Sequence, residues 1–265
     1  MIPPTYNPDW PEDLLALYRH DMQEIWDPNL ARQIWNQYHN QLNRYLAIAG
    51  DSPLRILDVG CAQGTLALLL AERGHQVTAV DIRPQFLQYA QSRYERGDIH
   101  FLVANVLEDE LPHGFDLIFA NQIIEHLVYP TQLLERLKRL LKPGGRLVVT
   151  TPNGQYLMNG LPSYRDLGDP RDWEHMQFTA DGDGHFFAYR ANELKEIFHS
   201  VGYEGIRCHF FETPFISGHM KIRHVHGLTP VTLLRAADRV LLALPGLGRI
   251  SAHQLMVSGI CPGGS

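Results

Sequence analysis

Short apolar runs alternate with longer amphipathic ones along the middle of the chain. The short runs are rich in leucine and β-branched residues and span residues 54–59, 76–81, 99–105, 115–123 and 146–152. Between several of them, apolar residues recur at the spacing of a helix. Strands that alternate with helices in this way are typical of a parallel sheet covered on both faces.

The pattern changes on either side of this segment. Residues 11–49 carry leucines, isoleucines and aromatic residues at helical spacings, with a break near Asp27 and Pro28. After Pro152 the alternation stops, and residues 153–187 are polar, aromatic and rich in turn residues. A connection of this length is typical of an active-site lid.

The end of the chain returns to regular patterns. It predicts two further helices and two further strands, the helices over residues 191–203 and 230–246 and the strands over 205–212 and 254–261. We therefore interpret the whole chain, residues 1–265, as a single domain. Its expected segments are a helical cap (1–50), a core that binds a cofactor (54–152), a lid that binds an acceptor (153–190) and a C-terminal helix and strand segment (191–265).

Composition narrows the class of protein. With 265 residues, of which 45% are hydrophobic, the chain is long enough to bury a sizeable core. Its formal net charge of −6 gives no basic surface for nucleic acid, so we expect no nucleic-acid partner. The three cysteines lie far apart and suggest neither a disulfide framework nor a zinc motif, which favours a reducing cytoplasm. No apolar run is long enough to predict a transmembrane segment.

The stretch ILDVGCAQG, residues 56–64, is the first candidate binding loop. Ala62 and Thr65 stand where a dinucleotide fingerprint has its second and third glycines, and no phosphate-binding GK[ST] follows. Asp58 would repel a phosphate but would attract an ammonium or a sulfonium. Asp81 ends the next predicted strand, where a carboxylate can accept hydrogen bonds from both hydroxyls of a ribose. A cationic head on an unphosphorylated nucleoside describes S-adenosylmethionine, whose product after methyl transfer is S-adenosylhomocysteine.

The same residues resemble a family. Together with VTAVD, FDLIFANQIIEHL and LLKPGGRLVVTTPN, the loop is similar to class I S-adenosylmethionine-dependent methyltransferases, in the group that includes ubiquinone-pathway O-methyltransferases and saccharide-tailoring enzymes. The resemblance is close over residues 54–152 and weaker over GHFFAYRANELKEIFHSVGY. It implies an α/β, Rossmann-like sheet of seven strands in the order 3-2-1-4-5-7-6, with residues 254–261 as the antiparallel strand.

The resemblance also implies roles for particular residues. Those expected to bind the methionine and ribose ends of the cofactor are Asp58, Gly60, Cys61, Gly64, Asp81 and Ile82. Asn105 and Val106 would face the adenine, where many relatives have an aspartate, and an amide oxygen can still accept a hydrogen bond there. Asn121 would face the ammonium and the transferring methyl group. We expect Cys61 to pack beneath the cofactor and not to act as a nucleophile.

Methyl transfer needs a base only if the acceptor must lose a proton. His126 directly follows the fourth predicted strand, and His185 follows the lid, so both are candidate catalytic bases. A structural role for the Glu125–His126 pair stays open, as does catalysis by alignment alone.

The lid offers aromatic and polar side chains for an acceptor pocket, the alternative being a surface excursion that packs on the domain. They are Tyr156, Tyr164, Arg165, Trp173, His175 and Phe178. The acidic residues of the same segment match no metal motif, so we expect no metal. Further along, His219, His224 and His226 are interpreted as part of a solvated connection, with an anion contact as the alternative. The helix over residues 230–246 is interpreted as core, with a homodimer contact or a dock for a lipid-linked acceptor as alternatives.

The resulting hypothesis is a methyltransferase that acts on a small-molecule acceptor, at the hydroxyl oxygen of a saccharide, phenolic or polyketide-like compound. Methylation of nitrogen or carbon is the nearest alternative. A nicotinamide-dependent oxidoreductase, or a protein that binds the cofactor without catalysis, would be a different class of protein.

Overall fold

The computed structural model of the chain describes residues 1–177, 185 and 187–263. Its centre is a mixed sheet of seven strands in the order β3-β2-β1-β4-β5-β7-β6, which confirms the predicted topology. The strands are β1 (Arg55–Val59), β2 (Gln76–Asp81), β3 (Asp98–Val103), β4 (Phe115–Asn121), β5 (Leu141–Pro152), β6 (Glu204–Phe211) and β7 (Gln254–Ile260). β7 runs antiparallel to both of its neighbours, β5 and β6, as the resemblance implies.

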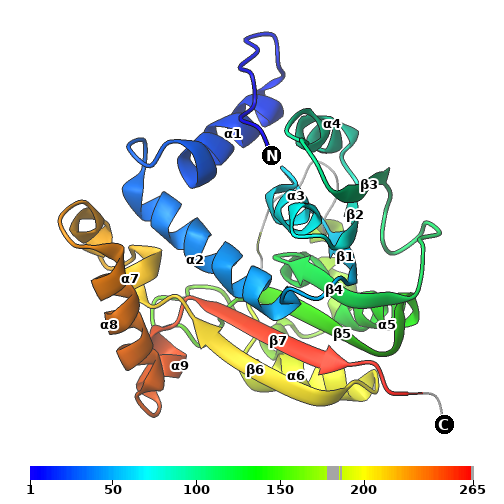
Figure 1. Cartoon of the computed structure of the whole chain (residues 1–265). Helices are drawn as coiled ribbons and strands as arrows, with labels where there is room; N and C mark the ends of the chain where they lie inside the picture. The colour runs from blue at the N-terminus through cyan, green and yellow to red at the C-terminus, as the bar shows by residue number, and fades with distance from the viewer. Residues whose placement is uncertain (178–184, 186, 264–265) are drawn as a thin grey trace.

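Helices cover both faces of the sheet (Figure 1). One face carries α2 (Arg32–Ala49), α3 (Thr65–Glu72) and α4 (Pro84–Ser92), and the other carries α5 (Pro130–Leu140) and α6 (Ala191–Ser200). Before α2 come α1 (Glu12–Asp21) and the π-helix η1 (Met22–Trp26), so the expected break near Asp27 is confirmed. The short helix η2 (Ile124–His126) follows β4, and η3 (Tyr164–Leu167) and η4 (Pro170–Met176) lie in the lid. After β6 come α7 (Pro214–Ser217), η5 (Ile222–Gly227), α8 (Val231–Ala243) and α9 (Leu247–Ser251).

Two separate cores follow from the alternation of side chains along each strand. Ile56 of β1 and Val148 of β5 belong to the core beneath α2 and α3, whereas their neighbours Leu57 and Val149 belong to the core beneath α5 and α6. All four side chains are fully buried. Central strands with apolar residues on both faces are what a sheet covered on both sides requires.

The helix α8 differs from the predicted core helix. It buries only Leu234 and Asp238, and Leu233 and Val240 are largely exposed. It packs on α7 and α9 at the flank of the molecule rather than on the sheet (Figure 1). Within the described residues, no helix is both long enough and apolar enough to span a bilayer.

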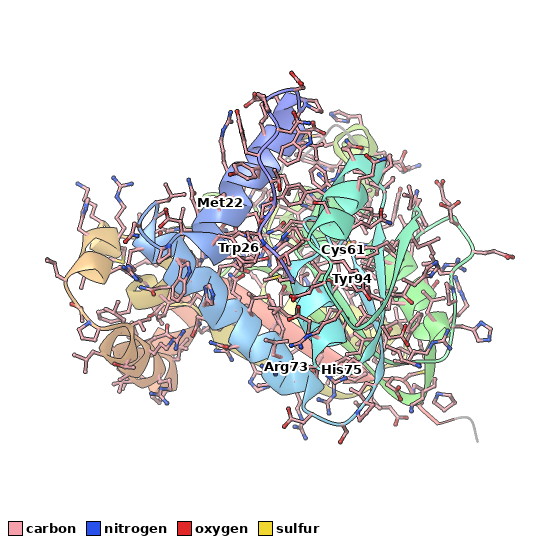
Figure 2. The ribbon with its side chains drawn as sticks, turned by 45° about the horizontal axis from the view of Figure 1, so that its top comes forward. Met22, Trp26, Cys61, Arg73, His75 and Tyr94 are labelled. Carbon is pink, nitrogen blue, oxygen red and sulfur yellow. The ribbon has the colours of Figure 1, made fainter. Side chains whose placement is uncertain are left out.

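The two ends of α3 lie at the two edges where the sheet strands begin and end. Figure 2 shows Cys61 before the start of α3, and Arg73 and His75 beyond its other end. The end with Cys61 is the carboxyl edge of the parallel strands, where open α/β sheets bind their ligands.

Candidate functional site: a cofactor cavity and a neighbouring pocket

The loop after β1 is held in a shape that needs its glycines. Gly60 and Gly64 have φ values of +65° and +74°, and Ala62 between them has +47°. A Cβ on Gly60 would lie 2.7 Å from Cδ1 of Ile123, and a Cβ on Gly64 would lie 2.7 Å from Cβ of Ala90. Both glycines are therefore fixed by backbone conformation and by packing.

A cavity of about 390 Å³ opens beside this loop, at the carboxyl ends of β1, β2 and β4. Six residues expected to bind the cofactor line it: Gly60, Asp81, Ile82, Asn105, Val106 and Asn121. Asp58, Cys61 and Gly64 do not line it. Burial raises the pKa of the Cys61 thiol well above its usual range, which agrees with packing and not with a nucleophile.

Asp58 is the most unusual charge near the cavity. Its side chain is buried, and burial, followed by repulsion from Asp81, raises its pKa to about 7. A cation bound nearby would stabilise the charged form of this carboxyl. An electrostatic role of Asp58 toward a positively charged ligand therefore stays a prediction.

Asp81 is engaged more fully than the sequence predicted. Its Oδ2 accepts a hydrogen bond of 3.0 Å from the backbone N–H of Ala62. Its Oδ1 accepts hydrogen bonds from the backbone N–H and the Nε–H of Arg83, at 3.0 and 3.2 Å. The carboxylate thus closes the glycine loop onto β2, and its remaining lone pairs are what it can offer to a ribose. The side chain of Arg83 also lines the cavity, and the sequence analysis overlooked it.

The side chain of Asn105 already makes one hydrogen bond within the chain. Its Oδ1 accepts a hydrogen bond of 3.0 Å from the backbone N–H of Leu107, so the side chain holds its own turn. One lone pair of the same oxygen remains for a ligand such as an adenine amine. Val106 and Leu107 add apolar surface to this end of the cavity.

The end of β4 connects the cavity to a second one. Asn121 Oδ1 accepts a hydrogen bond of 3.0 Å from Thr150 Oγ1. Gln122, with a φ of +54°, donates through Nε2 to Oε1 of Gln254 at 2.9 Å. Gln122 lines both cavities, and a non-glycine residue with positive φ is uncommon and clusters at functional sites.

The second cavity, of about 550 Å³, contains three imidazoles. His185, His219 and His253 line it together with Tyr156. The rings of His219 and His253 lie 4.3 Å apart, and Nδ1 of His219 is 3.1 Å from the hydroxyl of Tyr156. Burial, with the neighbouring His219 and His185, lowers the pKa of His253 to about 4, so His253 is neutral at pH 7.

The two candidate bases meet between these cavities. His126 lines the cofactor cavity and His185 lines the second one, and their ring centroids are 4.7 Å apart. Glu125 lies beside them, fully buried, with its Oε1 3.9 Å from Nε2 of His185. Burial raises the pKa of Glu125 to about 8. One atom from each of these three side chains lies within 4.8 Å of the other two, so this set fits a divalent metal ion, which the sequence did not predict.

The lid residues divide into two groups. Tyr156 reaches the second cavity, as predicted, whereas Tyr164 and Trp173 pack against the core and Arg165 pairs with Glu196 on the surface. Tyr164, Trp173 and Arg165 therefore fit the alternative interpretation, in which the lid packs on the domain. His175 is exposed, and Phe178 lies outside the described residues.

The histidines after β6 were interpreted as a solvated connection, and this is wrong for two of them. His219 lines the second cavity, and His226 is buried, with its Nδ1 3.1 Å from Nδ2 of Asn36 on α2. His224 is exposed.

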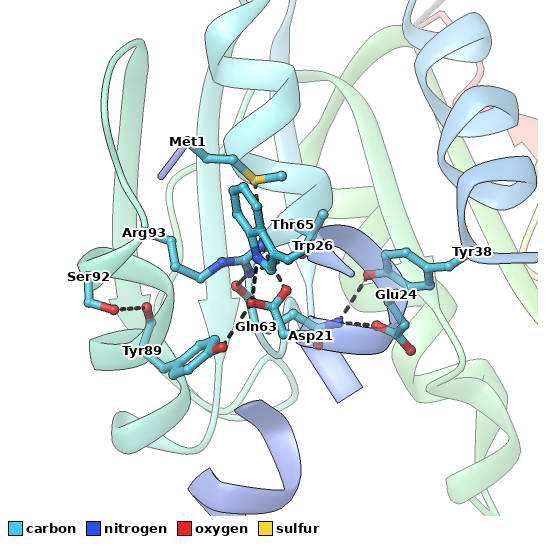
Figure 3. Close-up of polar contacts among 10 residues, drawn as sticks. All are labelled: Met1, Asp21, Glu24, Trp26, Tyr38, Gln63, Thr65, Tyr89, Ser92 and Arg93. Carbon is cyan, nitrogen blue, oxygen red and sulfur yellow. Dashed lines mark hydrogen bonds and ion pairs between the residues drawn. The ribbon is translucent and has the colours of Figure 1, made fainter. Parts of the chain in front are cut away.

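The N-terminal cap holds the glycine loop through a buried ionic cluster (Figure 3). Arg93, at the end of α4, is fully buried, and its Nη2 lies 2.8 Å from Oδ1 of Asp21 in α1. Its Nη1 donates to the backbone oxygen of Gln63 at 2.6 Å and to Oγ1 of Thr65 at 3.0 Å. The Gln63 side chain in turn donates to Glu24 at 2.8 Å. Residues of the cap therefore position the loop without lining the cavity.

Comparison with known proteins agrees with this geometry. A family model described as "Methyltransferase domain" matches residues 18–207. An uncharacterized methyltransferase of Mycobacterium bovis is 43% identical over 107 residues, which are 40% of this chain and 54% of that protein. A ubiquinone biosynthesis O-methyltransferase of Xylella fastidiosa is 39% identical over 106 residues, covering 38% of this chain and 43% of that one. The chain thus spans about half the length of the curated relatives that it matches.

A solved structure extends the likeness to nearly the whole fold. The crystal structure of a SAM-dependent methyltransferase from Archaeoglobus fulgidus has a TM-score of 0.55 and 16% identity, covering 92% of this chain and 98% of that one. The family match, the strand order and the cavity beside the glycine loop agree, so the chain belongs to the class I S-adenosylmethionine-dependent methyltransferase family.

Proposed function

We propose that the enzyme transfers the methyl group to a hydroxyl oxygen of a small-molecule acceptor held in the second cavity. The observation that carries this proposal is the contact between His126 and His185 at the junction of the two cavities. A base at that junction can reach a hydroxyl group that approaches the cofactor. The name of the Xylella relative, an O-methyltransferase, supports the same chemistry.

The expected reaction is a single displacement. Bound S-adenosylmethionine supplies an electrophilic methyl group on a sulfonium. Transfer of this methyl group to the acceptor oxygen would break its bond to sulfur, and the hydroxyl proton would pass to the imidazole of His185 or His126. Glu125 is buried beside His185, with its Oε1 3.9 Å from Nε2, and is placed to orient this imidazole.

The sharpest test replaces His185 with alanine. Turnover with a hydroxyl acceptor should fall by about a hundredfold or more, because general base catalysis contributes about that much. The Kd for S-adenosylmethionine, measured by calorimetry, should stay within about threefold of the wild type, because His185 does not line the cofactor cavity. His175→Ala, an exposed position in the same lid, is the matched control.

His126→Ala separates the two candidate bases. If both single variants keep more than a third of the wild-type turnover, neither histidine is the base and alignment alone drives the reaction. Treatment with EDTA tests whether a metal ion takes part. If turnover is lost and Mg²⁺ or Mn²⁺ restores it, Glu125, His126 and His185 would bind a metal that activates the hydroxyl.

Asp81→Ala tests the cofactor side independently of the acceptor. The carboxylate closes the loop through Ala62 and Arg83, so its loss should raise the Kd for S-adenosylmethionine by about tenfold or more. Unchanged affinity would remove Asp81 from the cofactor site.

A further inference from the structure

A groove that is separate from both cavities lies on the face of the sheet that α2 only partly covers. Its volume is about 610 Å³, and it is bounded by the α2 face and by β5, β7 and β6. The residues that line it are separate from those of the cofactor cavity and of the neighbouring pocket. Nothing in the proposed methyl transfer uses it.

Strand register explains how cationic side chains gather in this groove. Ser258 of β7 lies between Val148 of β5 and Arg207 of β6, and Arg146 lies opposite Ile260, two pairs further along. Side chains two residues apart share a face of a strand, so Arg146, Arg207 and His209 all point to the α2 side. Arg146 and Arg207 stand on either side of β7, about 10 Å apart in the direction of strand spacing.

The helix above adds donors to the same groove. Asn40 and Arg44 are four residues apart on α2 and therefore share one face of the helix. Nδ2 of Asn40 and Nε of Arg44 are buried, and neither has a hydrogen-bond acceptor in the structure. Buried donors of this kind require a partner, which an anion with several oxygens can supply.

Acidic groups are missing from the lining. Among the described residues, no carboxylate lines the groove, and Arg44, Arg146 and Arg207 form no ion pair within 4.0 Å. Arg44 does interact electrostatically with the buried carboxyls of Glu212 and Asp238, and its positive charge acts to lower the pKa of each. Arg44 and Arg207 in turn contribute, after burial, to lowering the pKa of His209.

The floor of the groove is apolar. Val148, Met256 and Ile260 form it from the sheet, and Ile48 adds to it from α2. A ligand that fits must therefore combine several anionic oxygens with an aliphatic part.

We propose that this groove binds an organic oxyanion, a phosphate monoester head on an aliphatic stem, through Arg146, Arg207 and the buried donors of Asn40 and Arg44. The guanidinium groups provide paired N–H donors for phosphate oxygens, and the stem lies on the partly exposed side chains of Ile48 and Ile260. Two copies of the same cationic groove would repel each other, which disfavours a symmetric dimer through this face.

His209 is the reporter for the test, because its ring lines the groove and faces Arg44 on α2 and Arg207 on its own strand. Its pKa is measured by NMR, with the resonance assigned from its loss in His209→Gln. Saturating inorganic phosphate, compared with chloride at equal ionic strength, should raise this pKa by about one unit, because a nearby anion stabilises the charged imidazole. Equal pKa values in the two salts would overturn the proposal.

Variants identify the donors. Arg207→Gln and Arg146→Gln should each weaken phosphate binding by about tenfold, because each removes charged hydrogen bonds. Both positions are exposed, and thermal unfolding verifies that each variant folds. Arg139→Gln, an exposed arginine on α5 at the opposite face of the sheet, should bind phosphate like the wild type. Equal affinity in all three variants would show nonspecific attraction and overturn the assignment.

Octyl phosphate tests the stem. It should bind at least about tenfold more tightly than inorganic phosphate, because each buried CH₂ adds apolar contact. Ile260→Ser should remove most of this gain and leave the affinity for inorganic phosphate unchanged. If octyl phosphate binds no more tightly than inorganic phosphate, the groove takes a bare oxyanion and the proposed stem is wrong.

Discussion

Two buried charged clusters lie on opposite sides of the cofactor cavity, and they differ in how their carboxylates are satisfied. On the cap side, Asp21 receives hydrogen bonds from Tyr89 and Trp26 at Oδ2 and an ion pair from Arg93 at Oδ1. On the acceptor side, both oxygens of Glu125 are buried and no donor lies in good hydrogen-bond geometry; weaker contacts with Thr151 and its own backbone offset burial only in part, and Nε2 of His185 is 3.9 Å from Oε1.

Pairing separates the two sides more clearly than pKa does, because burial also raises the pKa of Asp21 and raises that of Glu24 in the cap to about 8. A buried charge that is paired and hydrogen-bonded fixes one arrangement of the chain, here the arrangement of the cap on the glycine loop. A buried carboxyl without donors keeps its proton to a higher pH, and Glu125 accordingly has a pKa raised to about 8. Groups poised to exchange protons near neutral pH are typical of active sites.

The largest expected effect breaks the cap-side cluster. Arg93→Met removes the counter-ion of Asp21 and should lower the free energy of unfolding by about 3–5 kcal/mol, the usual cost of leaving one partner of a buried pair alone. Urea denaturation measures this loss. Arg96→Met, an exposed arginine in the same turn, is the control and should change stability by less than about 0.5 kcal/mol.

The double variant Asp21→Asn with Arg93→Met separates the loss of the ion pair from the change in side-chain volume at position 93. It should be more stable than Arg93→Met alone, because it no longer buries an unpaired charge. If the double variant is no more stable than Arg93→Met, the loss comes from packing and the ion pair is not what holds the cap.

A smaller effect, of opposite sign, is expected on the acceptor side. Glu125 has a pKa of about 8 when folded and 4.5 as its ordinary value, so the folded state keeps a proton that the unfolded state loses. Below pH 4.5 the carboxyl is neutral in both states, and between 4.5 and 8 unfolding becomes progressively easier. Glu125→Gln removes this pH dependence. The free energy of unfolding of Glu125→Gln, relative to the wild type, should therefore rise by up to about 3 kcal/mol between acid pH and pH 7.

Urea denaturation at several pH values checks this trend. The stability difference between Glu125→Gln and the wild type should grow with pH over this window, while Glu135→Gln, exposed on α5, should show no such growth. A difference that stays constant with pH would mean that Glu125 is already charged in the folded protein.

The smallest effect removes one donor from the cap-side cluster. Tyr89→Phe deletes the hydroxyl that donates to Oδ2 of Asp21 at 2.8 Å and should cost about 1.5 kcal/mol, because the acceptor is charged. Tyr94→Phe deletes a hydroxyl that donates to Gly97 O at the same distance on the surface, and should cost much less. Equal losses in urea would make the Asp21 cluster no stronger than a surface hydrogen bond.

The sequence predicted the sheet well, because its signals are local. Alternating apolar runs and the glycines of the β1 loop depend on neighbouring residues, and the strand order follows the resemblance. The burial of Arg93 could not be predicted, because it stands in an amphipathic run typical of a surface. Its partner Asp21 comes from the cap, a remote part of the sequence.

His253 was missed for a different reason. Candidate residues were sought after strand ends, which is correct for parallel strands at the carboxyl edge of the sheet. β7 is antiparallel, so Gln254 at its start pairs with Pro152 at the end of β5. The residue before an antiparallel strand therefore belongs to the same edge, and this rule would have identified both His253 and Gln254.

The position of β7 also governs how the chain is assembled during synthesis. β7 is the last strand in sequence but lies between β5 and β6, and about 40 residues separate its start from the end of β6. At a synthesis rate of about 5–20 residues per second, β6 waits roughly 2–8 s on the ribosome before its only neighbour exists. During that interval the free edge of β5 is open to other strands, so the nascent enzyme depends on rapid completion, or on a chaperone, to avoid pairing with the wrong chain.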